Sequence, residues 1–239
     1  FTRGLISNNI ATNEGGGLSF FYSPNPIFSY LEITRNSAYT GGGINLYNTN
    51  PLLNNMTFSD NIATYGGGAI YGYESDVDMV NSILWYDSPD EIYSVGYSEL
   101  NIFFSDIENG WNGEGNIDAD PLFINSETGD YTLQTDSPCI DAGTAYFEYE
   151  GEVLVDMSPD EYFGDAPDMG AFEWYPEDSE FELGDFNADG SINVLDVVAL
   201  VANILSAGEF NPAGDLIEDG ELNVLDIVAL VNIILGGGE

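Results

Sequence analysis

The sequence has almost no positive charge. Its 239 residues include 42 Asp and Glu but only two basic residues, Arg3 and Arg35, with no lysine or histidine, so the formal net charge is −40. Nucleic acids and anionic membrane surfaces would be repelled by such a chain, and both are excluded as partners. The same self-repulsion destabilises a compact chain unless cations screen it. This predicts a salty, calcium-bearing environment outside the cell or at a bacterial cell surface.

Cysteine and long apolar runs are also scarce. The single cysteine, Cys139, excludes an internal disulfide framework. Because no histidine is present to activate it, we expect a small buried residue rather than a nucleophile. The sequence shows neither a signal peptide nor a transmembrane run. It opens in mid-pattern at Phe1, and we interpret it as the C-terminal piece of a longer secreted protein.

A fixed repeat runs through the first part of the chain. The composition, 44% hydrophobic and 13% aromatic, is too rich in core-forming residues for a disordered acidic tail. From Ile6 to about Ile83 the sequence repeats every 25 to 27 residues, as short alternating runs with almost no helix signal. This pattern predicts a solenoid in which each repeat is one coil, because the blade of a propeller needs about 40 residues. We predict a mainly β protein, a right-handed parallel β-helix.

Two features recur in every repeat. Asn9, Asn36 and Asn61 occupy equivalent positions and are expected to stack, with their amides hydrogen-bonded along the solenoid axis. Glycine triplets at 15–17, 41–43 and 66–68 mark places where the backbone turns tightly or approaches its neighbour closely. These residues resemble the Asn- and Gly-Gly-Ile-type repeats of polymorphic outer-membrane proteins and related β-helix repeat proteins.

The pattern loosens after Ile83. Residues 1–115 are predicted to form the β-helix coils, and residues 116–175 resemble the terminal segment of bacterial secreted β-helices, with terminal coils and a cap over the last coil. The acids of this segment also fit a catalytic or metal-binding role, which we treat as the alternative: Asp118, Asp120, Asp141 and Asp168.

Two acidic stretches near the C-terminus fit the twelve-residue calcium loop. Such a loop places oxygen ligands at positions 1, 3, 5, 7, 9 and 12 and a glycine at position 6. The first copy supplies Asp185, Asn187, Asp189, Ser191, Asn193 and Asp196. The second supplies Asp215, Asp219, Glu221, Asn223 and Asp226. Its position 3 is Ile217, which cannot coordinate a hard cation, so we expect one well-formed calcium site and one degenerate site.

Each loop continues into an apolar segment. The spacing within 194–205 and 224–235 predicts two short helices that bury most of their circumference. Neither helix would be stable alone. Residues 183–239 are therefore predicted to form a small α domain of two EF-hand-like loop–helix units, stapled by calcium. The acidic, proline-containing stretch 176–182 is predicted to be a linker.

At these loops, residues 183–236 resemble a type I dockerin, the calcium-dependent module that docks onto cohesin domains of a scaffold or cell-surface protein. In that family, positions 10 and 11 of each loop face the partner. The resemblance therefore implies four partner-binding residues: Val194, Leu195, Val224 and Leu225. Two near-identical apolar pairs imply a pseudo-twofold surface that could bind in either orientation. The same residues equally fit core positions, and the sequence leaves the two alternatives open.

Three functions fit these features. The β-helix could be a non-catalytic spacing or adhesive module, attached through the dockerin-like end to a cohesin-type partner. It could instead belong to a polysaccharide lyase or glycoside hydrolase tethered by that end, or to a calcium-rigidified extracellular matrix. We predict the first function for this region, with the polysaccharide-degrading enzyme as the alternative.

Chemistry bears on that alternative. The β-helix lyases typically use arginine or lysine as the general base, and only Arg3 and Arg35 are available, with Arg35 expected on the surface of a turn. A hydrolase needs two carboxylates about 5 to 9.5 Å apart, and no pair can be singled out among so many. A sugar-stacking face would need exposed aromatic residues such as Phe20, Phe21, Tyr22, Tyr47, Tyr71 and Tyr73, although ordinary strand positions are favoured for them.

Overall fold

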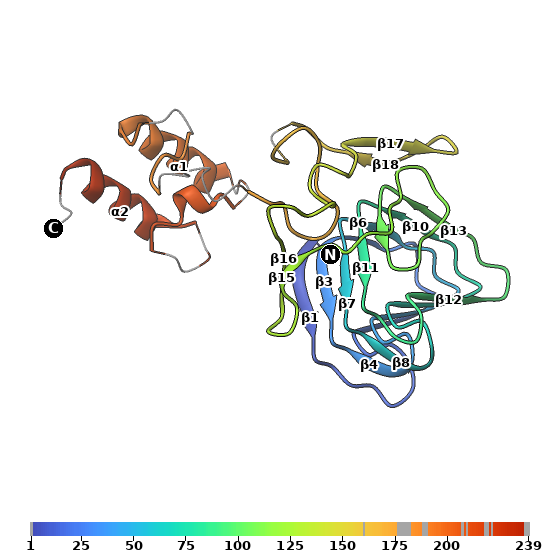
Figure 1. The fold of residues 1–239 in the computed structure, drawn as a ribbon. Helices are drawn as coiled ribbons and strands as arrows, with labels where there is room; N and C mark the ends of the chain where they lie inside the picture. The colour runs from blue at the N-terminus through green and yellow to red at the C-terminus, as the bar shows by residue number, and fades with distance from the viewer. Residues whose placement is uncertain are drawn as a thin grey trace. The chain divides into compact units, whose positions relative to one another are not determined.

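The fold was taken from a computed structural model, which describes residues 2–159, 161–175, 183–187, 191–206, 208, 210–217, 220 and 222–236. The chain forms two compact units, residues 1–175 and 176–239 (Figure 1). The linker predicted at 176–182 lies outside the described residues. No helix in the described ranges is both long and apolar enough to cross a membrane.

The first unit is a parallel β-solenoid of about four coils, which confirms the predicted parallel β-helix. One face is an eight-stranded sheet of β1 (Thr2–Ser7), β3 (Ile27–Thr34), β6 (Leu52–Asn54), β7 (Thr57–Ser59), β10 (Val77–Val80), β11 (Ile83–Trp85), β13 (Leu100–Phe103) and β14 (Asp106–Ile107). A second face contains β2 (Leu18–Phe21), β5 (Ile44–Tyr47), β9 (Ile70–Tyr73) and β12 (Ile92–Val95). The third contains β4 (Ser37–Thr40) and β8 (Ile62–Gly66).

Side chains alternate across these strands as the sequence pattern predicts. In β5, Ile44 and Leu46 are buried in the solenoid core, whereas Tyr47 points outward. The rungs above and below are in register, since Ile44 pairs with both Leu18 and Ile70. Each coil therefore adds a layer of buried aliphatic side chains to one continuous core.

The asparagine ladder is confirmed. The Nδ2 of Asn9 donates to Oδ1 of Asn36 at 3.0 Å, and Asn36 donates in the same way to Asn61 at 3.0 Å. The rungs are 27 and 25 residues apart in sequence. Asn36 and Asn61 are completely buried, so each amide must find its partners within the stack. The ladder ties the backbone of each coil to the next.

The glycine triplets behave as predicted, and two roles can be distinguished. Gly15, Gly41 and Gly67 have φ angles of 62°, 61° and 69°, the left-handed conformation that glycine adopts at no steric cost. At the residue after this turn the neighbouring coil is too close for a side chain, because a Cβ on Gly42 would lie 2.6 Å from the carbonyl oxygen of Gly68. The triplet thus combines a tight turn with close coil stacking.

The terminal segment of the first unit contains two hairpins, and the predicted division into terminal coils and a cap stays a prediction. Its two antiparallel hairpins are β15 (Phe123–Asn125) with β16 (Asp130–Leu133), and β17 (Tyr146–Tyr149) with β18 (Glu152–Asp156). They fold back along the outer face of the eight-stranded sheet, since Asn54 Nδ2 donates to the Leu154 carbonyl at 2.8 Å. Outward-facing apolar residues of that sheet, such as Ile83 and Val80, explain this position because the hairpins bury them.

The second unit contains two α-helices, α1 (Val194–Ser206) and α2 (Val224–Ile234), and a 3₁₀ turn, η1 (Pro212–Gly214). The two helices are confirmed. Their packing is pseudo-symmetric, because Gly184 lies against Leu230 of α2 and Gly214 lies against Leu200 of α1. Leu200 and Leu230 are fully buried. The buried leucine of each helix therefore packs against the glycine that immediately precedes the other loop.

Candidate functional site

The closing aspartate of each predicted calcium loop is fully buried. Asp196 accepts hydrogen bonds from the backbone N–H of Asn187 at 3.1 Å and of Asn193 at 2.7 Å. Asp226 accepts the equivalent bonds from Ile217 at 3.3 Å and Asn223 at 2.9 Å. The two loops thus close with the same geometry, each drawing its third and ninth residues onto the carboxylate at position 12.

Ile217 does not disturb this geometry. Its backbone N–H replaces that of Asn187 in the bond to the closing aspartate, and its side chain is 40% exposed. Asp215, at position 1, also follows the loop pattern, since its Oδ2 accepts from Gly220 N–H at 2.8 Å. In its described residues, the second loop therefore keeps the hydrogen bonds of the first to the closing aspartate, and position 3 offers no side-chain oxygen.

The ninth residue of each loop has a role that the ligand pattern did not predict. Oδ1 of Asn193 accepts from Leu195 N–H at 2.8 Å, and Oδ1 of Asn223 accepts from Leu225 N–H at 2.9 Å. Asn223 and Asp226 form a reciprocal capping box at the start of α2. Both amides therefore begin helices, and a contact of either with the ion would run through water or the second lone pair of the amide oxygen.

The donor set of this unit fits a divalent cation. Asp185 and Asp215 are almost as buried as the two closing aspartates. The sequence from 183 to 239 contains no lysine, arginine or histidine that could neutralise these four carboxylates. Buried charges of one sign require a counter-ion, and carboxylate, amide and carbonyl oxygens are the ligands that calcium prefers.

Three of the predicted ligands, Asp189, Asp219 and Glu221, lie outside the described residues. Within the ranges that the structure describes, no three acidic or cysteine side chains are grouped as a metal site. The predicted ligand sets therefore remain predictions.

The apolar pairs at the helix starts are exposed rather than buried. The pairs are Val194 with Leu195 and Val224 with Leu225. One turn later, Val198 and Val228 are exposed as well, and all six residues are 53 to 65% exposed. The prediction that each helix buries most of its circumference is therefore wrong, because a unit of this size cannot enclose two helices. Sequence analysis missed Val198 and Val228, although their i, i+4 spacing from Val194 and Val224 indicates the same face. Each helix presents one apolar face to solvent.

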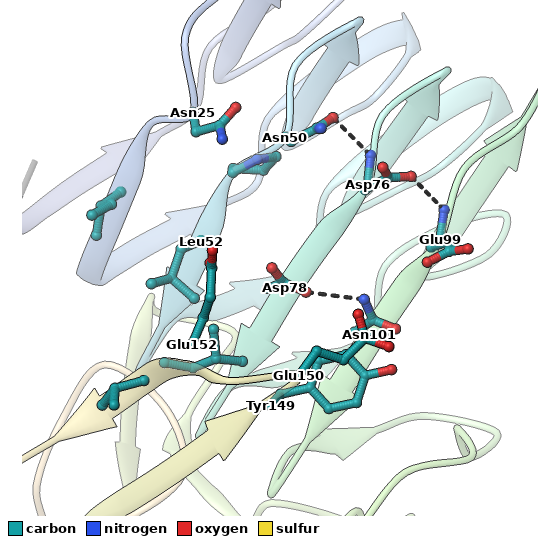
Figure 2. A pocket seen from close by; sticks show the side chains of 14 residues that line it. Asn25, Asn50, Leu52, Asp76, Asp78, Glu99, Asn101, Tyr149, Glu150 and Glu152 are labelled. Carbon is teal, nitrogen blue, oxygen red and sulfur yellow. Dashed lines mark hydrogen bonds between the residues drawn. The ribbon is translucent and has the colours of Figure 1, made fainter.

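The solenoid contains a separate groove. It has a volume of about 510 Å³ and lies between the β17–β18 hairpin and the first residues of β6, β10 and β13 (Figure 2). Five carboxylates line it: Asp76, Asp78, Glu99, Glu150 and Glu152. Two of them hydrogen-bond to the next coil. Asp76 accepts from Glu99 N–H at 2.8 Å, and Asp78 accepts from Asn101 Nδ2 at 3.0 Å. Neither arginine lines the groove.

The acids of the terminal segment make backbone hydrogen bonds. Asp168 is buried and accepts from Asp141 N–H at 2.8 Å and from Trp174 N–H, and burial raises the pKa of its carboxyl to about 6. Asp118 and Asp120 accept from the N–H groups of Asn109 and Leu122. These contacts organise turns, which favours the structural role over the catalytic alternative.

The aromatic residues stack on one another along the solenoid. The rings of Tyr47 and Tyr73 are 4.7 Å apart and nearly parallel, and Phe21 stacks on Tyr47 at 5.9 Å. Phe20 instead packs toward the core, against Phe28. Sugar stacking requires a free ring face, and the facing sides of Tyr47 and Tyr73 cover each other, although Phe21 and Tyr22 stay exposed at the end of this stack. The geometry therefore favours ordinary strand positions.

Comparisons with known families support both halves of the sequence interpretation. Residues 183–235 match the profile of the dockerin type I domain. Residues 55–73, which contain Asn61 and the glycine triplet 66–68, match the Chlamydia polymorphic membrane protein repeat. No curated protein and no solved structure matches the chain. The chain therefore joins a parallel β-solenoid with a polymorphic-membrane-protein-type repeat to a C-terminal dockerin type I region.

Proposed function

We propose that residues 183–239 attach the β-solenoid to a cohesin-type partner in a calcium-dependent manner, outside the cell or at its surface. The observation that carries this proposal is the duplication of one surface. Two loops of equal geometry each lead into a helix whose first turns expose apolar side chains. An exposed apolar face on an otherwise acidic chain is typical of a protein interaction site.

Calcium supplies the positive charge that these loops require. Asp185, Asn187, Asp189, Ser191, Asn193 and Asp196 would hold it in the first loop, and Asp215, Asp219, Glu221, Asn223 and Asp226 in the second. The closing aspartates also accept backbone N–H groups at the helix starts, so loop closure and helix initiation are one event. We therefore expect calcium binding and folding of this unit to be coupled.

Two measurements on the full chain test this coupling. Circular dichroism in the helical region reports on α1 and α2, and tryptophan fluorescence reports on residues 1–175, which contain Trp85, Trp111 and Trp174. Chelation of calcium should remove the helical signal and leave the fluorescence unchanged. Asp185→Ala with Asp189→Ala should have the same effect. A helical signal that persists unchanged without calcium would contradict the proposal.

Paired variants test the docking surface. Calcium titration and capture by immobilised cohesin domains should be measured for Val194→Ser with Leu195→Ser, for Val224→Ser with Leu225→Ser, and for the quadruple variant. Because the two faces are equivalent, each double variant should retain capture and the quadruple variant should lose it, with calcium binding unchanged in all. Ile10→Ser, an exposed apolar residue of the solenoid, is the matched control. Capture by the quadruple variant would refute the assigned surface.

The groove of the solenoid favours a second candidate function, recognition of a polysaccharide. Its carboxylates and amides can accept hydrogen bonds from sugar hydroxyls and donate hydrogen bonds to them, and Leu52 is among its apolar lining residues. A lyase mechanism is disfavoured there because neither arginine lines the groove. Binding or hydrolysis of a panel of soluble polysaccharides should be lost in Glu99→Gln with Glu152→Gln. If no polysaccharide binds, the solenoid is a spacer.

A further inference from the structure

The asparagine ladder ends in a carboxylate. Asp87 occupies the rung below Asn61, 26 residues later, where the repeat would place another asparagine. Its Oδ1 accepts from the backbone N–H of Asn61 at 2.6 Å and from Asn61 Nδ2 at 2.8 Å. The ladder donors thus satisfy one oxygen of the carboxyl group. The second oxygen, Oδ2, is buried and accepts no hydrogen bond.

A second buried acid, Glu91, interacts with the carboxyl group of Asp87. Glu91 is 7% exposed and Asp87 is 8% exposed. Glu91 Oε1 accepts from the backbone N–H of Asp87 at 3.2 Å, and Glu91 Oε2 is again buried with no partner. Two ionised carboxylates, each with one buried oxygen that accepts no hydrogen bond, would repel each other. One proton between the two groups would supply the missing hydrogen bond to both.

The surroundings contain further acids. Asp60 in the preceding coil and Glu108 in the following coil both raise the pKa of a member of the pair. Asp90 of the same turn is held by Gly67 N–H at 2.7 Å. Arg35 lies over the ring of Tyr131, whose hydroxyl donates to Asp60 at 2.8 Å, and it is not among the groups that interact with Asp87 or Glu91 most strongly. The described residues around the pair therefore offer acidic neighbours, and a proton is the simplest source of neutralisation.

We infer that Asp87 and Glu91 share one proton through neutral pH, and that this buried acid pair makes the fourth coil of the solenoid sensitive to alkaline conditions. Loss of the proton leaves two negative charges at the end of the ladder, next to Asn61. The turn from Tyr86 to Glu91 would then open, because hydration of the carboxylates becomes more favourable than their burial.

The pKa values support the sign of this effect. Burial is the largest cause that raises the pKa of Asp87 and of Glu91, and each group also interacts with the other. Both pKa values are higher in the folded state than in the unfolded state. At a pH between the unfolded and the folded pKa values, the folded state therefore binds more protons than the unfolded state. Stability is then fully present at acidic pH and falls as pH rises. One retained proton raises the unfolding constant tenfold per pH unit, or about 1.4 kcal/mol.

The test is urea unfolding of the full chain between pH 5 and 9, followed by tryptophan fluorescence. Glu91→Gln keeps a donor for Asp87 and should remove most of the tenfold-per-unit pH dependence, so that the variant becomes the more stable protein at pH 8. Asp87→Asn continues the asparagine ladder, and its stability should likewise lose most of the pH dependence. Glu127→Gln removes an exposed charge and should run parallel to the wild type.

Two results would overturn the inference. Variants at 87 and 91 with the same pH dependence as the wild type would show that no proton is shared. Calcium-dependent stability of residues 1–175 that disappears in Glu91→Gln would show that a cation, rather than a proton, neutralises the pair. Infrared spectroscopy of the native protein gives an independent check if a variant fails to fold. A protonated carboxyl band must be present at pH 8 and decrease at higher pH.

Discussion

Removal of one buried rung should show how much the ladder contributes to the solenoid. The Asn61 side chain makes four hydrogen bonds. Oδ1 accepts from N–H and Nδ2 of Asn36, each at 3.0 Å, and Nδ2 donates to the Ile33 carbonyl at 2.7 Å and to Asp87 at 2.8 Å. At a net value of about 1 kcal/mol each, Asn61→Ala should destabilise residues 1–175 by about 4 kcal/mol. The buried partners left unsatisfied would increase this value.

The ladder provides its own matched control. Asn9 belongs to the same column but is exposed, and it donates to Asn36 Oδ1 and to the Ser7 carbonyl. Water can replace both bonds, so Asn9→Ala should destabilise by less than about 1 kcal/mol. Asn61→Asp tests the chemistry further, because a carboxylate of the same size would face Asp87.

Urea unfolding monitored by tryptophan fluorescence measures these differences, since all three tryptophans lie within residues 1–175. Equal effects of the alanine substitutions at Asn61 and Asn9 would refute the account, because Asn61 is buried with four side-chain hydrogen bonds and Asn9 is exposed with two. A stability of Asn61→Asp equal to that of the wild type at pH 8 would also contradict it.

Three further outcomes are expected. Gly42→Ala should lower the free energy of unfolding by about 3 kcal/mol in the same urea assay, because the new methyl group would lie 2.6 Å from the next coil. Gly72→Ala is the control: its methyl group would lie 3.9 Å from the nearest atom, so the free energy of unfolding should change by less than about 1 kcal/mol. Cys139 should resist a thiol reagent until the solenoid unfolds, since it is fully buried and burial raises its pKa; rapid labelling of native protein would disprove this. Arg35→Ala should lower the thermal midpoint of residues 1–175, and Arg35→Lys should restore only part of it, because the guanidinium stacks over the Tyr131 ring.

Features with short-range or periodic causes were predictable. A repeat of 25 to 27 residues placed Asn9, Asn36 and Asn61 in one column, and the structure confirms that column. The glycine triplets followed from steric rules that act within and between adjacent coils. Both are consequences of a regular backbone, so each residue needs only its own repeat and the next.

Features that depend on distant segments were not predictable. The two hairpins within residues 123–156 cover the outer face of the eight-stranded sheet, where Asn54 contacts the Leu154 carbonyl, and no local pattern in the sequence indicates this placement. The groove exists because of this placement. Arg35 was expected on the surface of a turn, but it bonds to the Ser126 carbonyl and holds the β15–β16 hairpin.

By itself the sequence determined the solenoid, the asparagine column and the two loop–helix units of the dockerin-like region, because repetition and residue spacing are properties of the chain. Only the tertiary structure decided whether Val194 and Leu195 are core or surface, since exposure depends on how much of each helix the other loop–helix unit can cover. The tertiary structure likewise decided that Asp87 is the last rung and that Glu91 is buried with it. Two acidic side chains affect each other's ionisation strongly only when both are removed from water. Short-range geometry can be predicted from the sequence pattern, whereas side chains lose contact with water only when the coils pack together.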